Sequence, residues 1–222
     1  MRVLELFCGV NRSVGKVAEA MGWEVISVDI NPLANPDLLQ DILDFNETKY
    51  DKDYFQFIWA SPPCQSYSRA RSKAKVERDE AMELADRLLT KTRQIVAYFG
   101  CHWCIENPAT SRIWMREVAR GLVETSCITS YCSFGMQYRK DTRIANSLEL
   151  SLPRCPGAGV CAAMIGSRHK EWAQKGINIK KDGGSSQRNH TLDELHSIPY
   201  GLIEDILSEL VYVPARTAEL GG

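Results

Sequence analysis

Short apolar runs alternate with amphipathic stretches along the first two thirds of the chain. The apolar runs, rich in Val, Ile, Phe and Trp, are RVLELF, WEVISVDI, FQFIWA and CHWCIEN, and each has the length of a strand. Apolar residues recur at helical spacing in residues 14–22 and 76–99, and residues 112–122 are also expected to be helical. Strands that alternate with helices in this way predict an α/β fold with a doubly wound, mostly parallel sheet.

The later part of the chain follows a different pattern. CITSYCSF and TRIANSLEL alternate as strands do, without a helix between them, which predicts an antiparallel hairpin at the edge of the sheet. Periodicity is then lost in a stretch rich in Gly, Pro, Ser, Lys and Arg, and a last helix is expected at 202–211. We therefore divide the chain into a main domain at 1–150, a small loop-rich insertion at 151–190 and a C-terminal segment at 191–222 that returns to the main domain.

The composition adds few constraints. With 44% hydrophobic and 25% charged residues among 222, the chain resembles ordinary soluble globular proteins. A net charge of −1 gives no overall basic field for nucleic acid, but it leaves room for a local basic patch. We find neither a secretory signal nor an apolar run near the roughly 20 residues of a membrane span. We therefore expect an intracellular protein, cytoplasmic or nuclear and not secreted, whose eight cysteines are reduced.

LELFCGV is the first candidate binding motif. It places a glycine turn between a strand and a helix, which is where nucleotide-like ligands bind at the carboxyl edge of a sheet. Asp29 ends the next strand, about twenty positions on, where an acidic side chain can accept both ribose hydroxyls. The glycines form neither GxGxxG nor a phosphate loop, so we expect a nucleoside-like ligand without a pyrophosphate, such as S-adenosylmethionine. A structural turn without a ligand is the alternative.

The second candidate is a cysteine in SPPCQS. Pro62 and Pro63 fix the backbone directly after a buried strand, so Cys64 would be held at the edge of the sheet with one reachable side. CIENPAT places Glu106 at the end of the next strand, and neighbouring parallel strands would bring both side chains to the same edge. A thiolate can add to a ring while a carboxyl group engages a ring nitrogen. A turn with an incidental buried cysteine is the alternative for this motif alone.

These motifs together carry a resemblance to a family. LELFCG, SPPCQS, IENP and FGMQYRKDTR occur in the order and at the spacing seen in cytosine-C5 DNA methyltransferases, over residues 1 to about 149, and TLDELHSIP resembles the family's penultimate motif more weakly. The related amino-methyltransferases carry an aromatic residue where Cys64 stands. The resemblance implies a Rossmann-like methyltransferase domain at 1–150, a minimal target-recognition insertion at 151–190, S-adenosylmethionine as cofactor, and DNA methylation by base flipping.

The resemblance also implies roles for individual residues. Cys64 would attack C6 of cytosine and Glu106 would engage N3 and the exocyclic amine. Arg139 and Arg143 would hold the flipped nucleotide and its phosphate, with a solvated surface as the alternative for both. The cofactor-binding residues would be Phe7, Gly9, Asp29, Ile30, Asp41, Ile42 and Pro62.

Several departures from the family pattern leave alternatives open. Glu5 replaces the usual aspartate, VNRSVG is poor in glycine, and the last family motif is not recognisable, which leaves the far wall of the cofactor pocket undefined. The insertion has only about forty residues, so we expect a short recognition sequence, loose specificity or help from a protein partner, in an enzyme that is itself a monomer. The same chemistry on RNA, and a catalytically silent regulatory homologue, are the two competing interpretations.

The insertion contains a second set of chemistry-bearing residues. Cys155, Cys161 and His169 are soft ligands within fifteen residues and could bind a structural zinc ion, with Cys132 or His190 as the fourth ligand. A loop with ordinary thiols is the alternative. Basic residues nearby are interpreted as phosphate contacts. They are Arg154, Arg168, Lys170, Lys175, Lys180, Lys181 and Arg188.

Overall fold

A seven-stranded sheet forms the centre of the protein in the computed structural model, which describes residues 1–64, 75–173 and 190–212. The strand order is β3-β2-β1-β4-β5-β7-β6, and the strands from β3 to β5 run parallel, whereas β7 is antiparallel to both of its neighbours. The strands are β1 (Arg2–Leu6), β2 (Glu24–Asp29), β3 (Leu38–Leu39), β4 (Phe57–Ala60), β5 (His102–Pro108), β6 (Ser126–Ser130) and β7 (Asp141–Asn146). The predicted α/β class, with an antiparallel hairpin at one edge, is confirmed.

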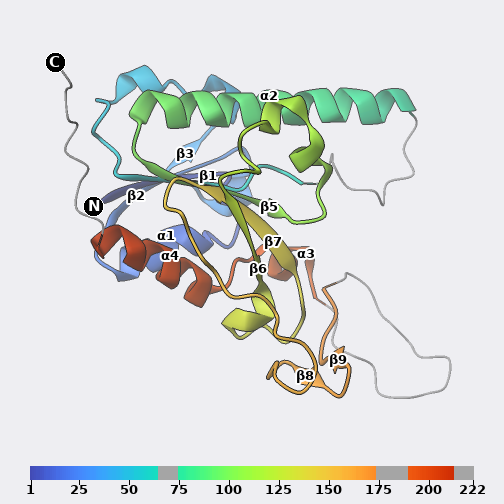
Figure 1. Ribbon diagram of the computed structural model, residues 1–222. Coiled ribbons are helices and arrows are strands. Elements are labelled where there is room, and N and C mark those ends of the chain that lie inside the picture. The colour runs from blue at the N-terminus through green and yellow to red at the C-terminus, as the bar shows by residue number, and fades with distance from the viewer. Residues whose placement is uncertain (65–74, 174–189, 213–222) are drawn as a thin grey trace.

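Helices cover both faces of this sheet (Figure 1). The long helix α2 (Lys75–Phe99) covers one face, and α1 (Ser13–Ala20) and α4 (Tyr200–Tyr212) pack side by side on the other. Each layer has its own apolar core, one around Leu89 of α2 and the other around Ile206 of α4. Because both faces are covered, the central strand β4 is buried at every position, as its continuous apolar sequence predicts.

Two sequence-based expectations differ from the structure. Residues 112–122 contain two short 3-10 helices, Arg112–Met115 and Glu117–Ala119, rather than one α-helix. They are separated by Arg116, whose backbone is extended and whose guanidinium forms an ion pair with Asp86 of α2. The predicted strand CITSYCSF ends at Ser130 and continues as a 3-10 helix, Tyr131–Phe134. A tertiary contact therefore overrides the local helical pattern in the first case.

The insertion is described as far as residue 173. It contains a small hairpin of β8 (Met164–Ile165) and β9 (Arg168–His169), which lies apart from the main sheet (Figure 1). The chain then re-enters the main body through α3 (Leu192–His196). The division of the chain at residues 150 and 190 stays a prediction. No helix among the described residues is long and apolar enough to cross a bilayer.

Candidate active site

A cavity of about 420 Å³ lies at the carboxyl edge of the sheet, where β1 and β4 end. After β1 the chain moves to β2 and β3 on one side, and after β4 it moves to β5 on the other. This reversal of strand order leaves a crevice between the loops, which is where open α/β sheets bind their ligands. Twenty-eight of the described residues line the cavity. Most come from the ends of β1, β2, β3, β4 and β5 and the loops that follow them, and the others come from α2, from Lys140 just before β7 and from the region of α3.

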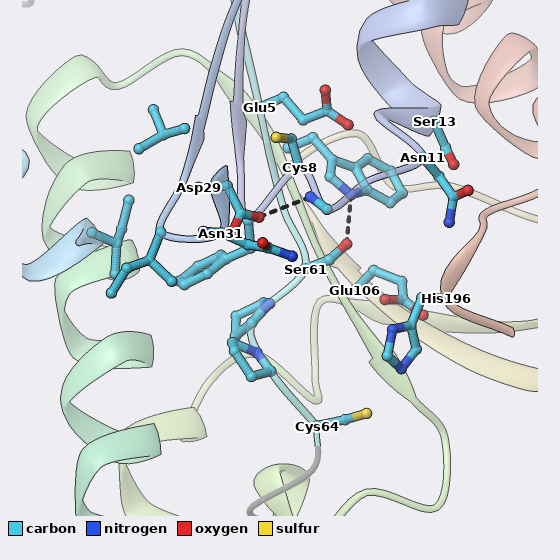
Figure 2. A pocket seen from close by; sticks show the side chains of 18 of the residues that line it. Glu5, Cys8, Asn11, Ser13, Asp29, Asn31, Ser61, Cys64, Glu106 and His196 are labelled. Carbon is cyan, nitrogen blue, oxygen red and sulfur yellow. Dashed lines mark hydrogen bonds between the residues drawn. The ribbon is translucent and has the colours of Figure 1, made fainter. Parts of the chain in front are cut away.

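The turn after β1 forms one wall of the cavity. Phe7 and Gly9 both adopt a left-handed backbone conformation, with φ of 59°, which is uncommon for a residue with a side chain. The backbone N–H of Gly9 donates a hydrogen bond of 2.8 Å to Asp29 Oδ2, and the N–H of Asn31 donates one of 2.8 Å to Asp29 Oδ1. Asp29 therefore holds the turn in place and presents its remaining lone pairs to the cavity (Figure 2).

Glu5 is a buried carboxyl group beneath the same turn. Its side chain is only 2% exposed and accepts hydrogen bonds from the backbone N–H groups of Val14 and Gly15, at 3.1 and 3.0 Å, in the first turn of α1. Burial raises its pKa to about 7, against the opposing effect of these two N–H donors. A Cβ atom on Gly15 would lie 2.7 Å from Glu5 Oε2, so the helix can approach the carboxylate only because residue 15 is glycine.

The loop after β4 carries Cys64. Asn107, at the end of β5, donates a hydrogen bond of 2.7 Å from its side-chain amide to the carbonyl oxygen of Pro62. Trp59 donates one of 2.8 Å from its indole N–H to Ser61 Oγ. The two prolines and these two anchors hold the loop against β5, and Figure 2 shows the Cys64 sulfur on the side of the cavity where Glu106 lies.

Glu106 lies on β5, on the face of the sheet that packs against α1 and α4. It is 6% exposed and accepts hydrogen bonds from the hydroxyls of Thr142 and Tyr131, the second at 3.4 Å. Burial raises the pKa of the Cys64 thiol, the Glu106 carboxylate raises it further, and the ammonium group of Lys140 lowers it. Cys64, Glu106 and Lys140 thus form one electrostatically coupled group.

The far wall, which the sequence left undefined, is formed by α3 and the residues after it. Asp193, His196 and Ile198 line the cavity there. The segment is attached to the turn after β1, because Asn11 Nδ2 donates a hydrogen bond of 2.5 Å to the Asp193 carbonyl and the Ile198 N–H donates one of 3.2 Å to Ser13 Oγ. TLDELHSIP therefore closes the site from a point more than 180 residues away in sequence.

Nine of the eleven predicted catalytic and cofactor-binding residues line this cavity, and two do not. The nine are Phe7, Gly9, Asp29, Ile30, Asp41, Ile42, Pro62, Cys64 and Glu106. Arg139 pairs instead with Asp141, with Nε and Nη2 each within hydrogen-bonding distance of the carboxylate. Arg143 donates a hydrogen bond of 2.6 Å to Ser126 Oγ and lies over the Trp114 ring. Strand alternation explains the position of Arg143, since Thr142 faces Glu106 and the next residue must point to the other face. Arg139 precedes β7 and is held by its ion pair with Asp141.

Among the lining residues that the sequence did not single out are three polar side chains close to Cys64 and Glu106. Lys140 donates a hydrogen bond of 2.8 Å to the Leu195 carbonyl and lines the cavity, although the quoted motif FGMQYRKDTR contains it. His196 lies in the weaker motif, and burial followed by the Lys140 charge lowers its pKa. Asn107 follows Glu106 directly, and its buried amide oxygen has no hydrogen-bond partner among the described residues. All three residues belong to motifs that the sequence shows, but only the fold shows which side chains point into the cavity.

The predicted metal ligands lie outside this cavity, and they converge. Cys155, Cys161 and His169 come together with Cys132, so that one ligand atom of each lies within 4.8 Å of the other three. His190, the other suggested fourth ligand, is instead paired with Glu171 at 2.9 Å and is not in this group.

Known proteins that are similar to this chain indicate the family to which it belongs. No family model matches the chain. A probable DNA (cytosine-5)-methyltransferase of Frog virus 3 (isolate Goorha) is 30% identical to it in an alignment of 224 positions that covers 93% of this chain and 99% of the viral protein. Among solved structures, Entamoeba histolytica methyltransferase EhMeth has a TM-score of 0.50 at 18% identity, and S. pombe Dnmt2 methyltransferase has 0.44 at 19%.

The alignments with the solved structures cover 69% and 66% of this chain but only 56% and 50% of theirs, so the chain spans about half of the length of those two proteins. The first of them shows the same fold. The viral relative matches this chain almost from end to end. This chain therefore belongs to the cytosine-C5 DNA methyltransferase family.

Proposed function

We propose that this protein transfers a methyl group from S-adenosylmethionine to C5 of cytosine in DNA, through a covalent bond between Cys64 and C6. One observation carries the proposal. Cys64, in the loop after β4, and Glu106, on the adjacent strand β5, line the same cavity as the residues expected to bind the cofactor. A nucleophile and a carboxyl group are thus available beside a nucleoside-sized space, as the reaction requires.

The residues present fit S-adenosylmethionine. A cavity of about 420 Å³ is within the usual range for a cofactor site, roughly 300–1,000 Å³. The carboxyl groups of Glu5, Asp29 and Asp41 surround it and complement a cationic ligand with ribose hydroxyls. Asp29 would hold the ribose, Asp41 and Ile42 the adenine, and Phe7 and Gly9 the body of the molecule. When bound, the cofactor supplies an electrophilic methyl group.

The chain's own residues would activate the base. The Cys64 thiolate donates an electron pair to C6, a carbon–sulfur bond forms, and the C5–C6 double bond shifts its electrons toward C5. Glu106 holds a proton at N3, which offsets the negative charge that addition places on the ring. After C5 has gained its methyl group, its proton passes to a base, the carbon–sulfur bond breaks, and the electron pair returns to Cys64 as the double bond reforms.

The half-buried position of Cys64 inside the cavity requires an extruded base. A cytosine inside a duplex cannot bring C6 to a thiol in a cavity, so the nucleotide must rotate out of the stack. The unpartnered amide oxygen of Asn107 is an acceptor that the exocyclic amine of such a base could satisfy. Lys140, which counters the effect of Glu106 on the thiol pKa, would stabilise the thiolate.

The viral relative favours DNA over RNA as the substrate, because its name assigns it to DNA and it matches 93% of this chain. Exposed arginines on the insertion, Arg154 and Arg168, are available for phosphate contacts. Of the other basic residues expected to bind phosphate, Lys175, Lys180, Lys181 and Arg188 lie outside the described residues. The small insertion is compatible with a short target sequence or with specificity supplied by a partner.

Methyl transfer to matched substrates tests this proposal. The full chain is incubated with methyl-labelled S-adenosylmethionine and a DNA duplex or an RNA of the same sequence, and bisulfite sequencing then locates the modified positions. We expect label in DNA, at cytosine C5. Label in RNA alone would show that the substrate is RNA and not DNA, while the proposed reaction would stand. An absence of label in both, from protein that binds the cofactor, would support the silent homologue instead.

A further inference from the structure

Four soft ligands meet where the insertion leaves the main domain. Cys132 belongs to the 3-10 helix after β6, Cys155 and Cys161 lie in the loop after β7, and His169 is on β9. Cys132 and Cys161 are each only 8% exposed. These residues come from three separate segments, so their convergence is a property of the fold and not of a local sequence repeat.

The distances match tetrahedral coordination. His169 Nε2 lies 3.4 Å from Cys155 Sγ and 3.7 Å from Cys161 Sγ. Zinc bonds of about 2.3 Å to sulfur and about 2.0–2.1 Å to nitrogen, at tetrahedral angles, place the two ligand atoms about 3.6 Å apart. His169 is therefore already at the separation from Cys155 and from Cys161 that an ion between them would impose, and all four ligand atoms lie within 4.8 Å of one another.

The backbone around the cysteines supports thiolate ligands. The N–H of Gly157 donates a hydrogen bond to the Cys155 sulfur, and the loop turns at Gly157 and Gly159, both with positive φ. Donors of this kind orient the ligands of metal sites. Three thiolates and one Zn²⁺ leave one net negative charge, and the guanidinium group of Arg139 interacts electrostatically with Cys132 and Cys155.

The described part of the insertion has little apolar core of its own around these ligands. Among the described residues, the separate buried cluster here contains Cys132, Cys161 and Ala163, with Cys155 and Met164 packed against it. The hairpin of β8 and β9 has two residues in each strand and is separate from the main sheet. A region this small cannot bury enough apolar surface to fold by itself, and such regions are usually held by a metal or by disulfides.

We propose that Cys132, Cys155, Cys161 and His169 bind one structural zinc ion, which fastens the insertion to the catalytic domain. The site is closed, because the chain supplies all four ligands, and it has no part in the methyl transfer. Cys132 directly follows Tyr131, whose hydroxyl contacts Glu106, and Arg139 and Lys140 lead from the same region into β7. The ion therefore also supports the edge of the active site.

Metal analysis of the purified full chain is the first test. We expect about one zinc per chain by mass spectrometry of the metal content, and removal of zinc followed by Co²⁺ addition should give the visible spectrum of tetrahedral sulfur-ligated cobalt. Cys155→Ser and His169→Ala should lose the bound zinc. Cys101→Ser is the matched control, because Cys101 is half-buried on the main domain and should leave the zinc content unchanged.

The wild-type measurements keep the proposal falsifiable if a variant fails to fold. Wild-type protein that contains no zinc after expression in zinc-supplemented medium, and gives no tetrahedral cobalt spectrum after reduction, would overturn it. A disulfide between two of the three cysteines, found in protein that was freshly isolated under reducing conditions, would also overturn the proposal. Zinc content that is equal in the wild type, Cys155→Ser and His169→Ala would place the metal elsewhere.

Discussion

At the scale of single residues, the site combines a thiol that resists ionisation with a carboxylate beside it. Burial and Glu106 both raise the pKa of Cys64, and Lys140 only partly opposes them. Both effects favour the thiol form of Cys64 over the thiolate in the free protein. The sequence motifs predicted that this pair and the residues expected to bind the cofactor lie close together, because each motif ends a strand at one edge of the sheet. They could not show that Lys140 lines the cavity and that its basic neighbour Arg139 does not, because this depends on the direction of each side chain in the fold.

Replacement of the sulfur should stop the reaction without emptying the cofactor site. Cys64→Ser removes the nucleophile but changes the side-chain volume little, and Cys64 is not among the residues expected to contact the cofactor. We expect methyl transfer to fall by at least about a thousandfold, since an unactivated hydroxyl is a poor nucleophile. Calorimetry should show S-adenosylmethionine affinity within about threefold of wild type. A loss of cofactor binding would indicate a folding defect.

The pH dependence of Cys64 alkylation tests the electrostatic coupling. Because its folded pKa is raised, the rate of alkylation should increase with pH and have its inflection above 9.0, the ordinary value. Glu106→Gln removes a negative charge and should shift the inflection downward, whereas Lys140→Met should shift it upward. Peptide mass spectrometry distinguishes Cys64 from the other seven cysteines. Unchanged inflections in both variants would mean that the three groups do not interact.

At the scale of elements, the hydrophobic pattern predicted β1, β2, β4 and β5 and the helices α1, α2 and α4 closely. It missed β3, whose two residues are too few for a periodic signal. It also predicted one helix at 112–122, because a local pattern cannot show the bond between Arg116 and Asp86. The hydrophobic pattern also could not predict the contact between β1 and α1 through Glu5, although it predicted both elements.

Because of that contact, adding a single carbon atom to the side chain of residue 15 should destabilise the fold. Gly15→Ala would place Cβ 2.7 Å from Glu5 Oε2, so the helix or the carboxylate must move. We expect a loss of about 1–3 kcal/mol in the free energy of unfolding, measured with urea. Lys16→Ala, at an exposed position of the same helix, is the control.

A shorter carboxylate should relieve the clash. Adding Glu5→Asp to Gly15→Ala should recover part of the lost stability, and the double-mutant cycle should show a coupling energy of about 1 kcal/mol. Equal stability of Gly15→Ala and the wild type would show that the close approach is unimportant.

At the scale of the whole molecule, the active site depends on contacts between distant parts of the chain. The turn after β1 is joined to α3, and the loop after β4 is joined to the end of β5. The sequence suggested the topology, since α/β patterns have few arrangements. It could not show that TLDELHSIP forms the far wall, because nothing in a chain pattern reports contacts across 180 residues.

The exposed arginines of the insertion should contribute to DNA affinity without sequence preference. Arg154→Ala and Arg168→Ala should each weaken binding to any duplex and reduce the slope of log K against log salt by about 0.9 per lost phosphate contact. Arg120→Ala is the control, because this exposed residue is paired with Glu117 in the segment that packs near α2. If the binding curves are the same for all three variants and the wild type, these arginines of the insertion do not contact DNA.

The most direct test of the central claim is covalent trapping. A DNA duplex with 5-fluorocytosine at the target carries fluorine where the C5 proton must leave, so the carbon–sulfur bond cannot be broken once methylation has occurred. With S-adenosylmethionine present, we predict a stable protein–DNA adduct that peptide mass spectrometry assigns to Cys64, and none from Cys64→Ser. An adduct at another residue, or none from protein that methylates the unmodified duplex, would contradict the account.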